Sequence, residues 1–415
     1  MTNLVMVMPY RAYVVKAREE GFRICAIWDP TLEKPAYLAE LEQRADAFVL
    51  TDFFDPPRFE AAVRDAVRDF GADLVYHVGR EDSMLATYRL AEELGKAVNS
   101  TRSVELLNDK LAMRRLLCEH GVSPVRFAVA DHWQDVEHLL DGFELPVVVK
   151  PTSLAGSRGV YLLRHRDELA AWGRLLRSYH YDGPVLVEER LRGPEFSVET
   201  MSHDGHHEVI GVTRKVLGRP PLFVEAGHVH PLADSPQARQ MGELTVELLR
   251  LTGYRCGPAH TEVIWTPDGP RIVESQARLG GDKIPRLVEL SSGLDVERAI
   301  FRTLAGRPPR PPAPHGVARI SYFELPVGVV SSVSGLDEAR ALDFVDELQL
   351  PFGPGDRIPV TVDSKSRHGF VIVSGGSEEE TARQVEVVRS IVRVEVEAPA
   401  PAEPAGVGAG TGEHG

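Results

Sequence analysis

Two periodicities alternate along the first hundred residues of the chain. Apolar runs typical of buried strands occupy residues 3–8, 22–28 and 72–78. Charged stretches with helical spacing occupy residues 11–20, 58–70 and 81–94. Strands that alternate with helices indicate parallel β-α-β units. We therefore expect residues 1–100 to form a small doubly wound α/β domain.

The loop at residues 79–82 follows the third of these apolar runs. In doubly wound sheets, ligands bind beside the carboxyl ends of the strands, so this loop is expected to lie near a binding cleft. No GxGxxG sequence follows the first apolar run, which argues against dinucleotide binding.

Residues 258–281 show the clearest pattern of the chain. Apolar and polar residues alternate, turn at Pro267-Asp268-Gly269 and alternate again, which predicts a β-hairpin. Side chains two positions apart on a strand point to the same face, so Glu274, Gln276 and Arg278 share one face and the hairpin can bring Glu262 beside them. Carboxylate and amide oxygens are ligands that Mg²⁺ prefers, and an arginine there can hold phosphate or carboxylate oxygens. The alternative is a surface hairpin with a solvated polar face.

Composition and charge narrow the class of protein. The 415 residues are 43% hydrophobic and 26% charged, which is ordinary for a globular chain with two or three cores. A net charge of −14 argues against general nucleic-acid binding. Cys25, Cys118 and Cys256 show no metal-binding spacing and are interpreted as reduced, mostly buried thiols of a cytoplasmic protein. No signal peptide is recognised, and no run reaches the ~18 apolar residues of a membrane span.

The middle of the chain carries candidate phosphate ligands. A strongly helical segment at 103–121 contains Lys110, which taken alone is an ordinary solvated lysine. Lys150 ends an apolar strand, and a loop of small residues at 153–159 follows it. Successive backbone N–H groups in such a loop can cradle phosphates, although the loop is no Walker A sequence because no GK[ST] follows. The alternative is a flexible hairpin loop.

Residues 185–203 and 223–231 add further polar candidates. An apolar strand ends at Glu188 and Glu189, and the extended chain past Leu191 can offer backbone groups to a purine, with Glu195 placed to accept from ribose hydroxyls. The sequence around His228 and His230 is expected to be a loop before a helix at 235–251, and ordinary loop histidines are the alternative there.

These motifs together carry a family resemblance. Lys110, KPTSLAGSRGV, VEERLRGPEFSVE, HTEVIW and IVESQARLGGD follow one another in an order that resembles the ATP-grasp superfamily of carboxylate–amine ligases. The resemblance covers residues 1–395 and is most specific at 145–285. Within the superfamily the chain is most similar to bacterial L-amino-acid ligases that make dipeptides, and to carnosine-synthase-type enzymes. The GPAHTE, GHVHP and AR-LGGD strings argue against D-alanine–D-alanine ligase.

The resemblance implies a role for each matching position. Nucleotide-binding roles are implied for Lys110, Lys150, Ser153, Gly156, Ser157, Gly159, Glu188, Glu189, Leu191 and Glu195. Metal-binding roles are implied for Glu262, Glu274 and Gln276. Many members have asparagine where this chain has Gln276, which is one methylene longer. Arg278, His228 and Lys150 are the implied catalytic residues, with Arg278 neutralising the acyl phosphate and the tetrahedral intermediate.

The resemblance also implies a domain plan. It predicts an α/β (α+β) chain with an ATP-grasp fold, an N-terminal doubly wound domain and a C-terminal β-rich cap over the substrate cleft. The expected parts are an N-terminal domain at 1–100, an ATP-grasp domain at 101–310 divided into a lid part at 101–190 and a catalytic part at 191–310, a cap at 315–396 and a disordered tail at 397–415. The loop at 367–369 is expected near the cleft.

The implied activity is ATP-dependent joining of a carboxylate, expected to be that of an amino acid, to an amine through an acyl phosphate. ATP and Mg²⁺ (two ions, replaceable by Mn²⁺) are the implied cosubstrate and cofactor, and a homodimer without nucleic-acid or membrane partners is expected. Two alternatives stay open. One is an ATP-grasp ligase for a specialised-metabolite acid or a carrier protein, and the other is a non-catalytic ATP-binding protein.

Overall fold

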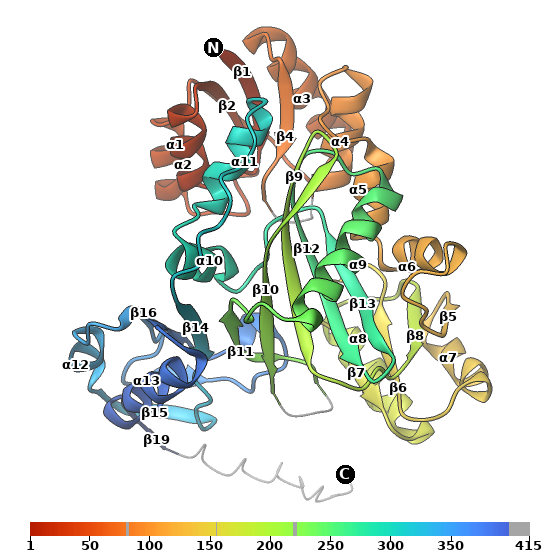
Figure 1. Ribbon diagram of the computed structural model, residues 1–415, viewed down its shortest axis with the longest axis vertical. Coiled ribbons are helices and arrows are strands. Elements are labelled where there is room, and N and C mark those ends of the chain that lie inside the picture. The colour runs from red at the N-terminus through yellow and green to blue at the C-terminus, as the bar shows by residue number, and fades with distance from the viewer. Residues whose placement is uncertain (80–82, 155, 219–221, 398–415) are drawn as a thin grey trace, which may run out of the picture.

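The computed structural model describes residues 1–415 apart from 80–82, 155, 219–221 and 398–415. Most of the predicted ligand loop at 79–82, one residue of the small-residue loop and nearly all of the predicted tail therefore lie outside the described residues. Within the described part of the chain, the strands form four sheets (Figure 1). No helix in that part is long and apolar enough to cross a bilayer.

The N-terminal domain is a parallel sheet of order β3-β2-β1-β4 with helices on both faces. Its elements are β1 (Thr2–Val7), α1 (Arg11–Glu19), β2 (Phe22–Trp28), α2 (Pro35–Glu42), β3 (Ala47–Leu50), α3 (Pro56–Phe70), β4 (Leu74–His77) and α4 (Met84–Glu93). The doubly wound arrangement confirms the prediction, while α2 and β3 were not predicted. The strand β3 has only four residues, none of them buried, so it leaves a weaker apolar signal than its neighbours.

Residues 101–119 form two helices instead of the single predicted one. They are α5 (Thr101–Asn108) and α6 (Lys110–Glu119). Asp109 between them has an extended backbone, and its carboxylate accepts a hydrogen bond from the Ala112 amide. An aspartate in this position caps the start of a helix, so it interrupts the helical run and makes Lys110 the first residue of a new helix.

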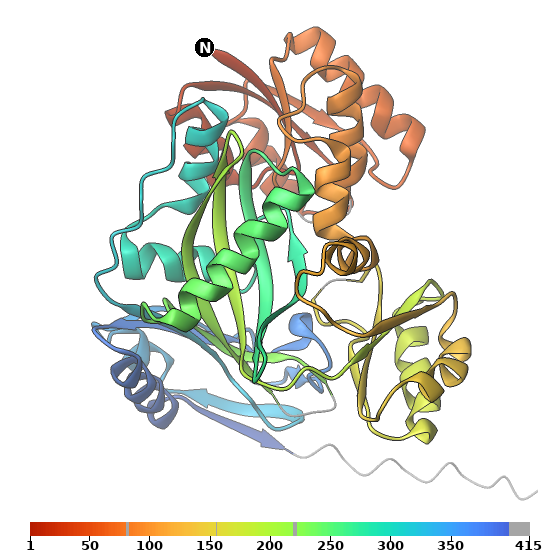
Figure 2. The same cartoon turned by 45° about the vertical axis from the view of Figure 1, so that its right-hand side comes forward.

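The lid is an antiparallel sheet of order β5-β8-β6-β7 with its own hydrophobic core around Trp172. Its strands are β5 (Phe127–Ala130), β6 (Val147–Pro151), β7 (Tyr161–Leu163) and β8 (Val185–Glu189). Its helical elements are η2 (Trp133–Asp135), α7 (Val136–Leu139), η3 (Leu140–Gly142), η4 (Arg166–Glu168) and α8 (Leu169–Ser178). Figure 2 shows the lid beside the lower half of the central sheet, on the side away from the cap.

The central sheet has eight strands in the order β13-β12-β9-β10-β11-β14-β18-β16. Its strands are β9 (Glu195–His203), β10 (His206–Leu217), β11 (Glu225–His230), β12 (Gly257–Thr266), β13 (Gly269–Gln276), β14 (Val317–Tyr322), β16 (Val345–Gln349) and β18 (Phe370–Gly375). The helices α9 (Pro236–Thr252), α10 (Ile284–Ser292) and α11 (Val296–Leu304) accompany it. The hairpin β12–β13 and the helix α9 confirm the predicted elements.

The prediction of a loop around His228 and His230 was wrong, because these residues lie on β11. This strand pairs with β10 on one side and β14 on the other, and both histidines are buried. A Cβ at Gly227 would lie 2.4 Å from the Ile320 carbonyl oxygen, so glycine permits the close approach of β14. The glycine and histidines of this segment do not form a typical strand pattern, so the sequence did not predict a strand here. Pairing with β10 and β14 stabilises it.

The cap is partly continuous with the central sheet. Strands β14, β18 and β16 extend that sheet, whereas β15 (Gly328–Ser334), β17 (Arg357–Ile358) and β19 (Arg393–Glu397) form a separate small sheet. The helices α12 (Leu336–Arg340) and α13 (Glu378–Ile391) and the short helix η5 (Ser364–Ser366) complete this region. The continuity fixes the cap loop at residues 363–367 relative to the strands that carry the candidate site.

Candidate active site

A single pocket collects most of the predicted site residues. It lies between the lid, the central sheet and the cap loop, and its lining includes Lys110, Lys150, Gly156, Ser157, Glu188, Glu189, Leu191, Glu195, His228, Glu262, Glu274, Gln276 and Arg278. Ser153 and Gly159 do not line it. Ser153 is exposed, and the Gly159 carbonyl accepts a hydrogen bond from the Trp172 indole within the lid core.

The lid side of the pocket holds one carboxylate between two cations. Lys150 Nζ lies 2.7 Å from Glu188 Oε2, and Arg114 Nε lies 2.8 Å from Glu188 Oε1. Burial alone raises the pKa of Glu188, but Lys150 and Arg114 together lower it to about 2. Burial, followed by the charge of Arg114, lowers the pKa of Lys150 despite its partner. This wall therefore carries one more positive charge than negative.

Sequence reasoning did not identify Arg114, although its spacing offered a signal. It lies four residues after Lys110 on α6, which places both side chains on one helix face. Its guanidinium also donates to the carbonyl oxygens of Ile272 and Val273, at 2.9 and 3.3 Å. Arg114 therefore joins the lid to the hairpin strand that carries Glu274.

The glutamate side chains at the end of β8 have partners within the protein. Glu188 is held by the two cations, and Glu189 Oε1 accepts a hydrogen bond from the Arg126 amide. Any contact of this segment with a purine would therefore use the backbone beyond Glu189 toward Leu191, which lines the pocket.

The hairpin brings the two predicted metal-binding carboxylates together. Glu262 and Glu274 are cross-strand partners on β12 and β13. Lys110 Nζ lies 2.9 Å from Glu274 Oε2 and donates to the Leu154 carbonyl at 3.0 Å. Lys110 therefore connects the hairpin to the small-residue loop of the lid, which is where a phosphate ligand is expected.

The opposite wall holds one cation among three carboxylates. Lys215 Nζ on β10 lies 2.7 Å from Glu195, 3.3 Å from Glu225 and 2.8 Å from Glu262. Burial lowers the pKa of Lys215, but the three carboxylates raise it well above its ordinary value. Burial raises the pKa of Glu195, because one lysine shared by three carboxylates does not offset it. Neither Lys215 nor Glu225 was predicted from the sequence.

His260 extends this network below Glu262. Its Nδ1 lies 2.9 Å from Glu199 Oε1, and its Nε2 lies 3.6 Å from Glu262 Oε1. Burial lowers the pKa of His260, but the two carboxylates raise it to about 10, so the imidazole is charged at neutral pH. A Cβ at Gly280 would lie 2.8 Å from His260 Nδ1, which explains a glycine at this position.

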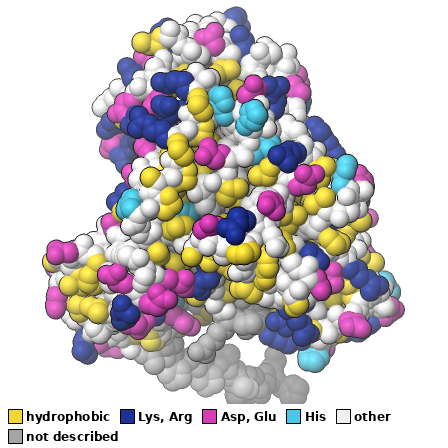
Figure 3. Space-filling model, in the orientation of Figure 1, with side chains coloured by type: hydrophobic (Ala, Val, Ile, Leu, Met, Phe, Trp, Pro, Cys, Tyr) yellow, Lys and Arg dark blue, Asp and Glu magenta, His cyan; other side chains and the backbone are white. Residues whose placement is uncertain are grey.

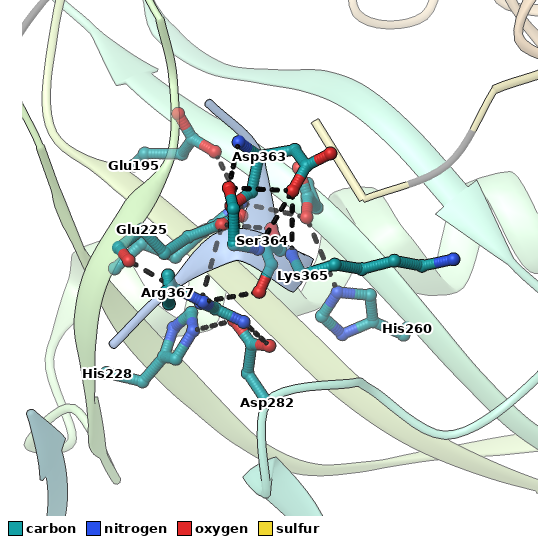
Figure 4. Close-up of polar contacts among 12 residues, drawn as sticks. Glu195, Glu225, His228, His260, Asp282, Asp363, Ser364, Lys365 and Arg367 are labelled. Carbon is teal, nitrogen blue, oxygen red and sulfur yellow. Dashed lines mark hydrogen bonds and ion pairs between the residues drawn. The ribbon is translucent and has the colours of Figure 1, made fainter. Parts of the chain in front are cut away.

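The cap loop approaches the far end of the pocket (Figure 4). His228 Nε2 lies 2.9 Å from Asp282 Oδ2, and Arg367 Nη1 lies 2.7 Å from the same oxygen. Arg367 also stacks over the Tyr322 ring at 3.7 Å, and Ser364 Oγ donates to Glu225 at 3.0 Å. Arg367, from the loop predicted near the cleft, thus contacts Asp282 of the pocket lining, whereas Ser364 and Asp282 were not predicted.

The second histidine of the predicted pair belongs to the core. His230 Nδ1 lies 2.9 Å from Thr213 Oγ1, and burial lowers its pKa to about 4. The imidazole is therefore neutral at physiological pH, and it is absent from the pocket lining, in contrast to His228.

The donor atoms at the hairpin fit a hard divalent cation. Within the described chain no group of three or more His, Cys, Asp or Glu side chains is arranged to hold a metal. The candidate set is instead two carboxylates, Glu262 and Glu274, with the amide of Gln276, all lining one pocket. Carboxylate and amide oxygens completed by water or phosphate oxygens are typical of Mg²⁺ sites.

Two regions of the chain match known protein families. The ATP-grasp domain family matches residues 143–286, and the family of the L-amino acid ligase C-terminal domain 2 matches residues 321–397. An uncharacterised protein of Sinorhizobium fredii is 30% identical over 279 residues, which are 65% of this chain and 57% of the relative's length. The chain therefore spans little more than half of that relative.

Two further similarities involve amino-acid ligases. The L-arginine-specific L-amino acid ligase of Bacillus subtilis is 22% identical over 301 residues, covering 70% of this chain and 71% of that protein. The crystal structure of an L-amino acid ligase from Bacillus licheniformis superposes with a TM-score of 0.80 at 21% identity, covering 96% of this chain and 99% of the other. The fold prediction is therefore confirmed. Residues 143–286 of the chain match an ATP-grasp domain, and residues 321–397 match an L-amino acid ligase C-terminal domain.

Proposed function

We propose that this protein is an ATP-dependent carbon–nitrogen ligase that activates a carboxylate, that of an amino acid, as an acyl phosphate and joins it to an amine. The proposal rests on the distribution of charge over the two walls of the pocket. One wall has an excess of cations around Glu188 and the other an excess of carboxylates around Lys215. Such a pocket suits a ligand with anionic phosphates and a divalent cation.

The basic wall would bind the nucleotide phosphates. Lys110 and Lys150 supply ammonium groups, and the backbone around Gly156 and Ser157 supplies N–H groups above them. Leu191 and its neighbours would receive the adenine, and Glu195 the ribose hydroxyls. The lid's contacts with the hairpin through Lys110 and Arg114 support a closed arrangement around these phosphates.

The hairpin would hold Mg²⁺, or Mn²⁺ in its place, through Glu262, Glu274 and Gln276. When bound, the metal supplies positive charge that offsets the repulsion between ATP and a carboxylate substrate. Arg278, which follows β13 and lines the pocket, would neutralise the acyl phosphate, and His228 would contact the substrate.

The chemistry requires two displacements. A carboxylate oxygen of the acid attacks the γ-phosphorus, the bond to the bridging oxygen breaks, and ADP leaves. The amine nitrogen then attacks the carbonyl carbon, the bond to the phosphate oxygen breaks, and the amine loses a proton. The products are an amide, ADP and phosphate. The cap loop and the lid would keep water from the acyl phosphate.

We further propose that the enzyme acts in the cytoplasm as a homodimer on small-molecule substrates. The buried free thiols of Cys25 and Cys256 fit a reducing compartment. Light scattering of the purified chain tests the dimer, and a mass of one protomer would refute it.

The deciding experiment measures release of ADP and phosphate from Mg²⁺-ATP with pairs of common L-amino acids, followed by mass analysis. Release that requires a pair and yields a new amide mass supports the proposal and identifies the substrates. Release without any added acid, or ATP binding with no turnover on any acid, would favour a non-catalytic nucleotide-binding protein. Activity only with a carrier-bound amine would favour a carrier-protein ligase.

A further inference from the structure

The lysine at the centre of the acidic wall has no role in the ligase chemistry described above. Lys215 is buried, with a side chain that is 4% exposed. Its three carboxylate partners come from three neighbouring elements of the sheet, since Glu195 begins β9, Glu225 begins β11 and Glu262 lies on β12. One ammonium group therefore connects four adjacent strands at the floor of the pocket.

Two of these partners have different tasks under the proposed function. Glu195 is assigned to the ribose hydroxyls and Glu262 to the metal, and both accept from the same Nζ at 2.7 and 2.8 Å. Two buried carboxylates this close to one another repel, and a shared cation holds them in one geometry. Without Lys215, Glu195 loses its cationic partner, and Glu262 keeps only the longer contact with His260 at 3.6 Å.

The third partner leads to the cap. Glu225 Oε1 lies 3.3 Å from Lys215 Nζ, and its other oxygen accepts from Ser364 Oγ at 3.0 Å and lies 3.8 Å from Arg367. The polar contacts thus run without a gap from the ribose side of the pocket to the cap loop (Figure 4).

We propose that Lys215 is a positioning residue that places Glu195 for the ribose and Glu262 for the metal at the same time, and that Glu225 joins this arrangement to the cap loop. The inference rests on the nucleotide site of the proposed function. It assigns to Lys215 an effect on ribose recognition although the residue itself needs no contact with the ribose.

The test compares binding of ATP and 2′,3′-dideoxy-ATP in the presence of Mg²⁺ by calorimetry, without acid or amine. Because removal of Lys215 alone leaves three buried carboxylates, the main variant combines Lys215→Met with Glu225→Gln, and Lys215→Arg is measured beside it. Glu195→Gln, Glu225→Gln and the exposed-lysine variant Lys34→Met are the controls.

We expect the native protein to prefer ATP by at least ~10-fold, because a site built for hydroxyls rejects an analogue that lacks them. Glu195→Gln and the double variant should both reduce this preference to ~3-fold or less, the size of one weakened hydrogen bond. Lys215→Arg should keep part of the preference, Lys34→Met should keep all of it, and Glu225→Gln alone should lose less of it than the double variant does.

A double variant that retains the full preference while Glu195→Gln loses it would overturn the positioning role and leave the nucleotide site intact. A native protein without any preference would overturn the ribose assignment itself, and this inference with it. Circular dichroism and thermal unfolding identify misfolded variants. If the double variant does not fold, Lys215→Arg decides the test. An unchanged preference of that variant for ATP over 2′,3′-dideoxy-ATP overturns the proposal.

Discussion

Both walls of the pocket are built from buried ion pairs. The lid wall has a surplus of cations, and the sheet wall has a surplus of carboxylates. On the lid, Glu188 lies between Lys150 and Arg114. On the sheet, Lys215 lies among three carboxylates. Each central group is satisfied, so the excess charge rests on the outer groups, which are cations on the lid and anions on the sheet.

This difference shows how a pocket can receive a metal–phosphate ligand without large unpaired charges. Under the proposed function, phosphate oxygens would be attracted to the lid wall and a divalent cation to the sheet wall. The surface in Figure 3 has basic and acidic side chains interspersed, so the segregation of charge is a property of the pocket and not of that face. Changes on the two walls should therefore have separable effects.

The largest effect is expected from a substitution on the sheet wall of the pocket. Replacement of Glu274 by alanine should lower kcat by ~10²–10³, because it removes a group that stabilises charge in the transition state. The measurement is ADP release with a substrate pair selected by the amino-acid screen. Glu243→Ala on the exposed side of α9 is a matched control and should leave kcat unchanged. Near-native turnover in folded Glu274→Ala protein would remove the hairpin from the active site.

The hairpin is also the part of the site that sequence alone predicts well. Glu262, Glu274 and Gln276 lie within one local element whose alternation is visible, and their faces follow from strand geometry. Lys150, directly before the small-residue loop, was detectable for the same reason, whereas the role of Lys110 on a separate helix came only from the family resemblance. The parallel N-terminal domain followed from alternating periods, since each β-α-β unit is contiguous in sequence.

The rest of the site depends on pairings between distant positions. Arg367 and Asp282 are 85 positions apart, and Lys215 meets carboxylates from three other strands. No periodicity links such residues, because their proximity results from the order of strands in the eight-stranded sheet. The continuation of that sheet into the cap was unpredictable for the same reason, since β14 pairs with a strand that was interpreted as a loop.

The second-largest effect is expected from a substitution on the lid wall of the pocket. Lys150→Met should weaken ATP binding ~10–100-fold with or without Mg²⁺, because a buried charged contact to phosphate is lost. Glu274→Ala should weaken it only when Mg²⁺ is present. Calorimetry with and without EDTA separates the two, and Lys150→Arg, which restores the charge, is the control. If the loss of ATP affinity depended on Mg²⁺ equally in both variants, the assignment of phosphate to the lid wall and metal to the sheet wall would be contradicted.

A smaller effect concerns stability against acid. The pKa of Glu188 is lowered from 4.5 to about 2, so its stabilising contribution is complete above pH 4.5 and is lost as the pH falls toward 2. The stability difference between the native protein and Glu188→Gln should therefore shrink by roughly 2 kcal/mol between pH 6 and pH 3. Urea unfolding at pH 6, 4 and 3 measures it, with exposed Glu243→Gln as the control. A difference that does not change with pH would show that Glu188 is not held by its two cations.

The smallest effect joins the two walls through the cap. Tyr179 at the end of α8 on the lid donates a hydrogen bond to Asp363 of the cap loop at 3.2 Å. Tyr179→Phe removes only this hydroxyl, so the free energy of unfolding should fall by about 1 kcal/mol or less. Under the proposed function the lid opens to admit ligands, so loss of this contact between lid and cap should favour the open lid. We expect a rise of ~3-fold in KM for ATP with little change in kcat. Tyr161→Phe on β7 is the matched control. A lower kcat with unchanged KM would mean that the hydroxyl acts in the chemical step and not in closing the lid against the cap.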